Sequence, residues 1–130
     1  MVAQGIEIVR DYGLITVNAL ILGKKKIQQL IMVVDTGACI TLIDPKVADA
    51  LLYSEKESLG KFKVTSPIGV EKGYRIKVKR FEVGRKFQDN FEVGVIPIHD
   101  AYGIDGLIGL NFLEKYNLQI KFKENMMWLK

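Results

Sequence analysis

Residues 33–38, Val-Val-Asp-Thr-Gly-Ala, constrain this chain more than any other stretch. They continue an apolar run that begins at Leu30, so Asp35 stands at the end of an expected buried strand. A carboxylate is costly to remove from water unless other groups compensate its charge. Gly37 lets the chain turn sharply and bring backbone N–H groups to the carboxylate, and the Thr36 hydroxyl can donate inside the turn. The pattern therefore predicts a carboxylate held in a fixed pose.

Two other interpretations of the Asp-Thr-Gly turn stay open at this point. Asp and Gly are common turn residues, so the tripeptide alone is also typical of an ordinary strand end. A nucleotide-binding turn of the actin and sugar-kinase kind also places Asp and Gly after an apolar strand. That fold needs a far longer chain than 130 residues. A second motif further along the chain is needed to favour a catalytic turn.

The composition indicates one globular domain over residues 1–130. Hydrophobic residues make up 48% of the chain and Gly outnumbers Pro by 12 to 3, which favours a packed core over disorder. A chain of this length can build such a core. Lys and Arg exceed Asp and Glu by 19 to 15, and the charges are mostly scattered singly. We identify no linker that would divide the chain.

Neither nucleic acid nor a membrane is an expected partner of this chain. The basic run at residues 24–26 lies between two apolar segments and predicts a hairpin tip, and residues 74–80 alternate basic with apolar side chains as a solvated strand face does. No apolar stretch approaches the ~20 residues that cross a bilayer. Residues 14–22 contain polar residues and lack a cleavage-site pattern, so they predict a strand and not a signal segment. A targeting or membrane segment outside this chain stays open.

Cys39 is the only cysteine and His99 the only histidine. A single cysteine permits no internal disulfide, which favours a reducing, cytoplasmic location. Cys39 directly follows the Asp-Thr-Gly-Ala turn and so suggests a catalytic thiol. His99 is far away in the sequence, however, and a small buried residue is the commoner role of a Cys beside a strand. One Cys and one His also give little basis for a metal site, and we expect no metal and no cofactor.

The pattern of apolar residues predicts a fold made almost entirely of β-structure. Strands are expected at residues 6–10, 14–22, 27–34, 40–43, 62–64, 74–83, 87–96, 118–122 and 126–129. Residues 14–22 and 27–34 are expected to form a hairpin that delivers Asp35 at its end.

Two short helices and two loops complete the expected elements. Asp44 and Pro45 predict the start of a helix, with Asp as N-cap and Pro in the first position, and residues 111–116 predict a second one. Residues 65–73 hold one Pro and two Gly between two expected strands and predict a long hairpin with a mobile tip. Residues 99–103 are expected to form another loop.

The second expected helix is preceded by Leu-Ile-Gly at residues 107–109. An apolar strand into Asp-Thr-Gly-Ala, a Gly-containing hairpin, and Leu-Ile-Gly before a short helix together resemble the retropepsin-like aspartic proteases over roughly residues 14–129. The resemblance implies a single-lobe, all-β acid-protease fold: a closed β-barrel with one or two short helices and a flap hairpin. It also implies an aspartic endopeptidase.

The chain holds only half of the active site that such a protease needs. Asp105 is followed by Gly106 and lacks the hydroxyl residue between acid and Gly, so Asp35 is the only Asp-Thr-Gly acid. The resemblance therefore implies a homodimer with one Asp35 from each chain across a twofold axis. The two carboxyls would share one proton. The ionised one would activate water, while the protonated one would stabilise the oxyanion and protonate the leaving nitrogen.

The resemblance also assigns the site residues. Thr36 would hydrogen-bond across the dimer axis and Gly37 would leave room for substrate backbone, so Asp35, Thr36 and Gly37 are the expected catalytic residues. The flap, with its tip at residues 68–69, would close over an extended polypeptide that pairs with the backbone as an added strand. The expected substrate-binding residues are Ala38, Ile68, Gly69, Leu107 and Ile108.

Three features place the chain closer to cellular and bacterial members than to viral ones. Viral members often carry an acid shortly after Asp-Thr-Gly-Ala and an Arg after the later Gly; here Cys39, Ile40 and Leu110 occupy those positions. Dimer strength would then come from apolar contact, with residues 126–129 as the candidate. The expected helix after Asp44 and the longer connection to the flap are the second feature. The third is a flap that lacks the Gly-Gly richness of the viral type.

Two alternatives to a protease stay open. A non-catalytic module of the same fold would bind an extended peptide or dimerise without cutting. The missing ion pair and the plain flap favour it, whereas the intact Asp35, Thr36 and Gly37 favour catalysis. A metal-dependent or thiol hydrolase is the least favoured reading of the residues.

Overall fold

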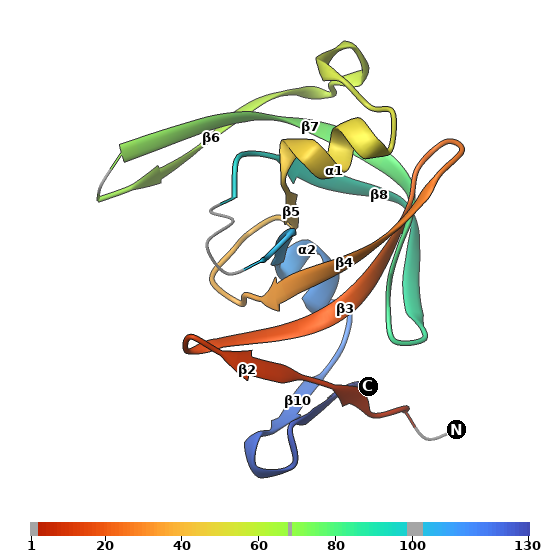
Figure 1. Cartoon of the computed structure of the whole chain (residues 1–130), viewed down its shortest axis with the longest axis vertical. Coiled ribbons are helices and arrows are strands. Elements are labelled where there is room, and N and C mark those ends of the chain that lie inside the picture. The colour runs from red at the N-terminus through yellow and green to blue at the C-terminus, as the bar shows by residue number, and fades with distance from the viewer. Residues whose placement is uncertain (1–2, 68, 99–102) are drawn as a thin grey trace.

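The computed structural model describes residues 3–67, 69–98 and 103–130. Its strands form an eight-stranded sheet in the order β2-β3-β4-β9-β5-β8-β7-β6 and a three-stranded sheet in the order β1-β11-β10 (Figure 1). The strands are β1 (Ile6–Glu7), β2 (Val9–Asp11), β3 (Leu14–Leu22), β4 (Ile27–Val34), β5 (Leu42–Ile43), β6 (Gly60–Ser66), β7 (Gly69–Val83), β8 (Lys86–Val95), β9 (Gly106–Ile108), β10 (Leu118–Lys121) and β11 (Met126–Leu129). The predicted all-β class is confirmed.

The larger sheet closes on itself. In addition to β4, strand β3 pairs with β7, so that β3, β4, β9, β5, β8 and β7 form a ring. Two pairs in this ring are parallel, β4 with β9 and β5 with β8. The closed sheet that the resemblance implies is therefore present, with β2 and β6 continuing it beyond β3 and β7.

Three aromatic rings pack the second helix against β7 and β8. Phe81 of β7 and Phe91 of β8 stack with their centroids 5.2 Å apart. Phe112 meets both edge-on, at 5.1 Å and 5.9 Å between centroids. All three rings are buried, and such pairs add to the free energy gained from apolar burial. They fix α2 (Leu110–Leu113), and with it the chain just before the helix.

Both predicted helices are present. The first, α1 (Pro45–Ala50), begins as predicted: the Lys46 N–H donates to the Asp44 carboxylate at 3.0 Å, and Pro45 occupies the first turn. The second, α2, is shorter than the predicted 111–116. Its last residues form a turn instead, closed by the Tyr116 N–H donating to the Leu113 carbonyl at 3.0 Å, which redirects the chain into β10.

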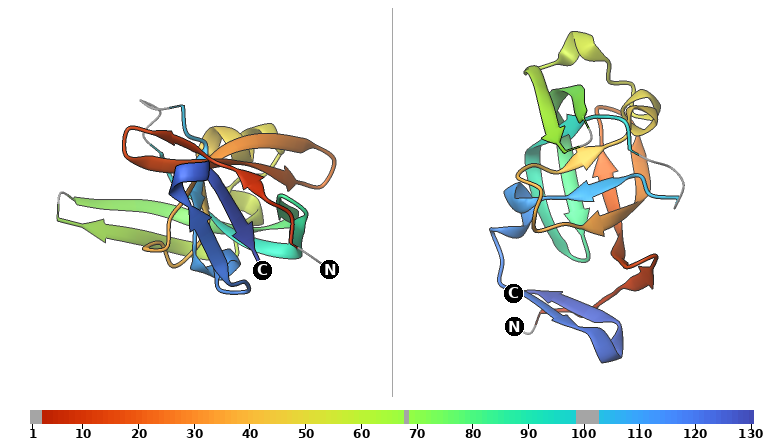
Figure 2. Two further views of the ribbon diagram at one scale, coloured as in Figure 1. Left: turned by 90° about the horizontal axis from the view of Figure 1, so that it is seen from below. Right: turned by 90° about the vertical axis from the view of Figure 1, so that its left-hand side faces the viewer.

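The long hairpin predicted around residues 65–73 is present, and its strands extend further toward the tip than the predicted 62–64 and 74–83. Strands β6 and β7 stay paired from Gly60 and Arg75 out to Ser66 and Gly69, and Pro67 lies in the turn that follows β6. The β-branched residues near the tip favour the strand, and the proline is confined to the turn, where no ladder bond is required of it. Figure 2 shows this β6–β7 hairpin projecting from the body. Ile68 and most of the predicted 99–103 loop lie outside the described residues.

The three-stranded sheet lies at the opposite end of the molecule from the hairpin (Figures 1 and 2). Met127 and Leu129 of β11 are buried against the body, while Met126 and Trp128 point the other way and are half-buried. The predicted strand at 6–10 is divided here, because β1 pairs with β11 and β2 pairs with β3. No helix in the described part of the chain is long and apolar enough to span a membrane.

Candidate active site

Strand β4 delivers Asp35 into the Asp-Thr-Gly turn. The Asp35 N–H donates to the Ile108 carbonyl at 3.0 Å and so continues the parallel ladder between β4 and β9. The Gly37 N–H donates to Asp35 Oδ1 at 2.9 Å, and the Ala38 N–H donates to the Asp35 carbonyl at 3.2 Å. One backbone N–H of the turn, that of Gly37, therefore holds one oxygen of the carboxylate.

The turn is open to the surface of the protomer. Asp35 and Ala38 are half-buried, and Thr36 and Gly37 are exposed. A Cβ added at Gly37 would lie 3.2 Å from Asp35 Oδ1, so a larger residue there would crowd the carboxylate. The single protomer thus presents one accessible carboxylate with room for a second chain or a ligand beside it.

Buried polar contacts support the turn from below. Asn111 Oδ1 accepts from both the backbone N–H and the hydroxyl of Thr41, each at 2.8 Å. The Thr41 hydroxyl in turn accepts from the Gly109 N–H at 3.1 Å, and Asn111 Nδ2 donates to the Glu92 carbonyl at 2.8 Å. We call Thr41, Gly109 and Asn111 the site floor. Thr41 is fully buried, and such satisfied networks hold their members in one arrangement.

The start of α2 covers the far side of the turn. The Leu110 N–H donates to the Ala38 carbonyl at 2.8 Å, and the Asn111 N–H donates to the Cys39 carbonyl at 3.3 Å. A Cβ at Gly109 would lie 2.5 Å from the carbonyl carbon of Ile40. The glycine of Leu-Ile-Gly is therefore required by the close approach of two backbones.

Asp105, the acid two residues before Leu107, is held by hydrogen bonds to the backbone of other segments. Its carboxylate accepts from the Ile31 N–H at 2.8 Å, and its own N–H donates to the Ile31 carbonyl at 2.8 Å. Its carbonyl accepts from the Asp44 N–H at 3.0 Å. Asp105 thus fastens the chain to the middle of β4, away from the turn that holds Asp35.

The expected substrate-binding residues differ in burial and in where they lie in the fold. Leu107 is half-buried and pairs with Val33 on one side and Leu42 on the other. Ile108 is fully buried in the core, so its side chain supports the turn from inside and its carbonyl holds Asp35. Gly69 is the first residue of β7 at the hairpin tip, and Ile68 lies outside the described residues.

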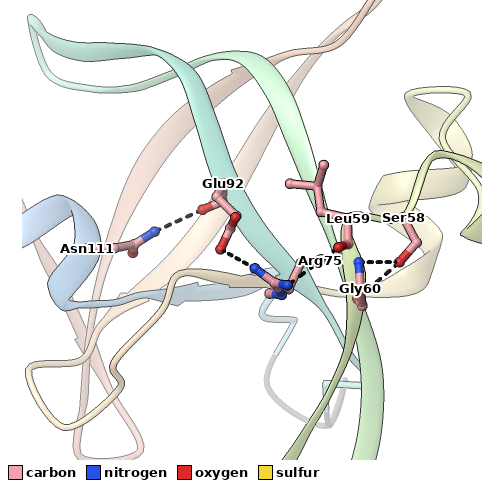
Figure 3. Close-up of polar contacts among 6 residues, drawn as sticks. All are labelled: Ser58, Leu59, Gly60, Arg75, Glu92 and Asn111. Atoms are coloured by element: carbon pink, nitrogen blue, oxygen red, sulfur yellow. Dashed lines mark hydrogen bonds and ion pairs between the residues drawn. The ribbon is translucent and has the colours of Figure 1, made fainter.

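A polar cluster ties the base of the hairpin to the site floor (Figure 3). The half-buried side chain of Arg75 pairs with the Glu92 carboxylate at 3.1 Å and donates to the Leu59 carbonyl at 3.5 Å. The backbone carbonyl of the same Glu92 accepts from Asn111. Ser58 closes the entry to the hairpin through bonds with the backbone of Gly60 at 3.0 Å.

Cys39 does not have the buried role that a small residue beside a strand would have. Its side chain is exposed, because the turn carries it to the surface while its carbonyl bonds to the start of α2. Within residues 3–67, 69–98 and 103–130, no group of three or more His, Cys, Asp and Glu is placed to hold a metal ion.

The sequence pattern did not single out Thr41 or Asn111. Both stand between apolar neighbours, Ile40 and Leu42 in one case and Leu110 and Phe112 in the other. A polar residue inside a buried apolar run needs a hydrogen-bonding partner, so this pattern is a usable signal. It indicates that a partner exists but not which residue it is.

The turn, the floor and the ring of strands together define the class of aspartic proteases built from a single lobe. Residues 17–115 match the model of a family described as gag-polyprotein putative aspartyl protease. The chain belongs to this family. No curated protein gives a significant sequence match.

Two solved structures share the fold. A retropepsin-like aspartic protease from Rickettsia conorii superposes with a TM-score of 0.72 at 21% identity, covering 98% of this chain and 100% of that one. The retroviral protease-like domain of Ddi1 from Leishmania major gives a TM-score of 0.59 at 19% identity, covering 90% and 88%. Both relatives come from cellular organisms, and the predicted resemblance to retropepsin-like aspartic proteases is confirmed.

Proposed function

We propose that this chain, as a single domain over residues 1–130, is one protomer of a homodimeric aspartic endopeptidase. The observation that carries the proposal is the pose of Asp35: a half-buried carboxylate held by the backbone of an exposed Asp-Thr-Gly turn in a chain that offers no second such turn. Asp105 does not supply the missing acid, since its carboxylate bonds to Ile31. The second acid is then Asp35 of another copy.

The chemistry follows from two carboxyls held close together. Like charges at short range disfavour double ionisation, so the pair shares one proton. The ionised Asp35 takes a proton from a water molecule that attacks the scissile carbonyl. The protonated Asp35 of the other chain stabilises the developing oxyanion and then protonates the leaving nitrogen. Thr36 would bond across the twofold axis, and no metal or cofactor takes part.

The arrangement of the protomer supports a paired site with a flap. The β6–β7 hairpin projects on the same side of the molecule as the loop between β4 and β5, which carries Asp35 (Figures 1 and 2). In this proposal it closes over an extended peptide. The half-buried outward side chains of Met126 and Trp128 offer apolar surface to a second copy, in place of the ion pair whose residues this chain lacks.

Exposed apolar side chains gather around β2 and the middle of β4, four residues before Asp35. Val9, Tyr12 and Ile31 are exposed large apolar residues, at 61%, 68% and 45% of their full accessibility. Together with Ile104 they line a hollow on the protomer, and Ile31 lies on the strand that ends at Asp35. Covering this hollow with a peptide side chain would remove apolar surface from water. Cleavage is therefore expected between apolar residues.

The test compares wild type with Asp35→Asn, a change that removes the charge and keeps the shape. Wild type is expected to cleave an apolar peptide pool best at acidic to neutral pH and to be inhibited by pepstatin-type mimics. Asp35→Asn should lose at least about a thousandfold in kcat/KM with an unchanged circular dichroism spectrum. Equal activity of the two proteins would refute the proposal, and peptide binding without cleavage by wild type would favour the non-catalytic module.

A mixing experiment tests the shared site. If each chain supplies one acid, equimolar Asp35→Asn should reduce activity per wild-type chain to roughly half, because random pairing places half of the wild-type chains in mixed dimers. An unchanged activity together with a monomeric mass by sedimentation would contradict the homodimer.

A further inference from the structure

The β6–β7 hairpin has two faces of different charge. Residues directly opposite each other in an antiparallel pair share a face, and faces alternate along each strand. One face carries the pairs Lys61↔Tyr74, Lys63↔Lys72 and Thr65↔Val70. The other face carries the pairs Phe62↔Gly73, Val64↔Glu71 and Ser66↔Gly69. Three lysines thus lie on the first face. The second face also carries the pair Gly60↔Arg75 at its base, so its charged residues are Glu71 and Arg75.

The face with Glu71 is the one turned toward the body. A Cβ added at Gly94 would lie 2.5 Å from Phe62 Cζ and 2.8 Å from Leu42 Cδ2, so the Phe62 ring occupies the space over Gly94 beside Leu42. A Cβ added at Gly73 would collide with the Val95 carbonyl. We call this side of the hairpin its inner face.

The inner face lies above the elements that lead to Asp35. Leu42, which Phe62 approaches, pairs with Leu107, and Leu107 pairs with Val33 just before Asp35. Glu71 is two residues beyond Gly73 toward the tip, about 7 Å further along the strand. Glu71 therefore belongs to the outer part of the hairpin, near its last pair Ser66↔Gly69. The hairpin projects past the body on the side of the β4–β5 loop (Figures 1 and 2).

Glu71 has no ion-pair partner on this face, because Arg75, the other charged residue there, pairs with Glu92 at 3.1 Å. The side chain of Glu71 is exposed, and its carboxylate forms no hydrogen bond or ion pair with any residue that the structure describes. Its cross-strand neighbour is Val64, and the hairpin lysines lie on the other face. An unpaired acid on the apolar underside of a hairpin is available to a cation that enters beneath it.

We propose that Glu71 makes the enzyme select substrates with a Lys or Arg side chain in the segment beneath the hairpin. This inference rests on the proposed function, because it assigns a specificity residue to the same peptide groove. Apolar residues would flank the scissile bond, and the cation would lie further along the peptide. When the hairpin closes, water is partly displaced and the ion pair strengthens. The lysines of the outer face would meet solvent and not the peptide.

The test uses two sets of peptides that share one apolar cleavage site. In each set a single position, scanned on both sides of the site, carries Lys, Arg, Gln or Glu. At the responsive position wild type should prefer Lys or Arg over Gln by roughly fivefold in kcat/KM, mainly through KM, and disfavour Glu. Glu71→Gln should abolish the preference, and Glu71→Lys should reverse it toward Glu.

Two matched variants control for net charge and for the hairpin itself. Glu124→Gln makes the same charge change at the end of the molecule opposite the hairpin, and Lys72→Gln changes a charge on the outer face next to Glu71. Both should keep the wild-type preference. A preference that survives in Glu71→Gln, or one that disappears equally in Glu124→Gln, would overturn the assignment.

A binding arm separates this inference from the proposed catalysis. The same labelled peptides are titrated with Asp35→Asn and with Asp35→Asn/Glu71→Gln, and affinity is read by fluorescence anisotropy. A Lys-over-Gln ratio of roughly fivefold in the first protein and none in the second supports the role of Glu71 even if wild type cuts nothing. Equal affinity of Asp35→Asn for Lys and Gln peptides at every position, or no peptide binding at all, overturns it.

Discussion

The site floor and the inner face of the hairpin lie on opposite sides of the proposed groove and are built in opposite ways. Thr41, Gly109 and Asn111 are joined by bonds of 2.8 to 3.1 Å, and Thr41 is fully buried. The outer part of the hairpin is a two-stranded ribbon with exposed side chains, including Val64 and Val70 at 40% and 51%. An isolated two-stranded ribbon is marginally stable by itself.

This difference indicates a division of roles. The floor joins the loop after Asp35 to the start of α2, and its satisfied buried network resists change. In the proposed function the hairpin would close and open, and its part outside Phe62 and Arg75 has few buried contacts to oppose that movement. Catalysis would then depend on the floor, and substrate selection on the hairpin. The following predictions compare changes in the two regions.

The largest effect is expected from Asn111→Ala in the floor. The change leaves the Thr41 N–H and the Glu92 carbonyl without their partner, which should cost about 2 to 4 kcal/mol of the free energy of unfolding. Activity should fall with it, mainly in kcat. Urea denaturation measures the loss, and Asn117→Ala at an exposed position should change stability by less than about 0.5 kcal/mol. Equal effects of the two changes would show that the floor is not a supporting network.

A smaller effect on global stability is expected from Gly73→Ala in the hairpin. The added methyl group meets the Val95 carbonyl, and overpacking of this kind costs about 1 to 3 kcal/mol. The hairpin should relieve the clash by lifting from the body, so amide hydrogen exchange should rise in β6 and the start of β7 while β4 keeps its protection. Thr65→Ala on the outer face is the control. Faster exchange in β4 would contradict the separation of the two regions.

The ion pair between Arg75 and Glu92 links hairpin and floor, and its expected effect is smaller again. Both side chains are about one-third exposed, so a double-mutant cycle should give a coupling of about 0.5 to 1 kcal/mol. Arg75→Ala should also raise KM more than it lowers kcat. The pair Arg80–Asp89 on the same two strands is more exposed and lies away from the hairpin base, so disrupting it should leave KM unchanged.

The smallest effect concerns Glu57, which lies outside both regions. Bonds from the Ser54 backbone N–H, from Lys24 and from the Ser54 hydroxyl lower the pKa of Glu57 from 4.5 to about 2. Because the folded-state pKa is depressed, this contribution to stability is complete above pH 4.5 and is lost as the pH falls toward about 2. Carboxyl NMR titration should place the midpoint near 2. Lys24→Gln should raise the pKa only in part, since the backbone bond remains, and an unchanged midpoint would show that Lys24 contributes nothing.

Local patterns in the sequence predicted much of the molecule. The strands at 14–22 and 27–34 were predicted with the bounds that the structure has, as was the start of α1 at Asp44 and Pro45. These features depend on side-chain alternation, turn residues and caps within a few positions of each other. The same is true of the Asp-Thr-Gly turn, in which the carboxylate bonds to an N–H two residues away.

The remaining features depend on contacts between distant parts of the chain. Asn111 reaches Thr41 across 70 positions, and the parallel pairing of β4 with β9 brings the Ile108 carbonyl to Asp35. Neighbouring residues in the sequence do not predict either contact. The only indication in the sequence is a polar residue within an apolar run. The side of the hairpin on which Glu71 lies was likewise set only by the β6–β7 register and by the Phe62 ring over Gly94.

The sequence alone determined that Asp35 ends a strand in a turn able to hold a carboxylate, because that geometry needs only neighbouring residues. The pairing of β3 with β7, which closes the sheet, decided how the other parts of the site are placed around this turn. It places α2 under the turn, the hairpin on the same side as Asp35, and Glu71 toward the body. These positions follow from how the strands pair and pack around a common core, which no short stretch of the chain specifies.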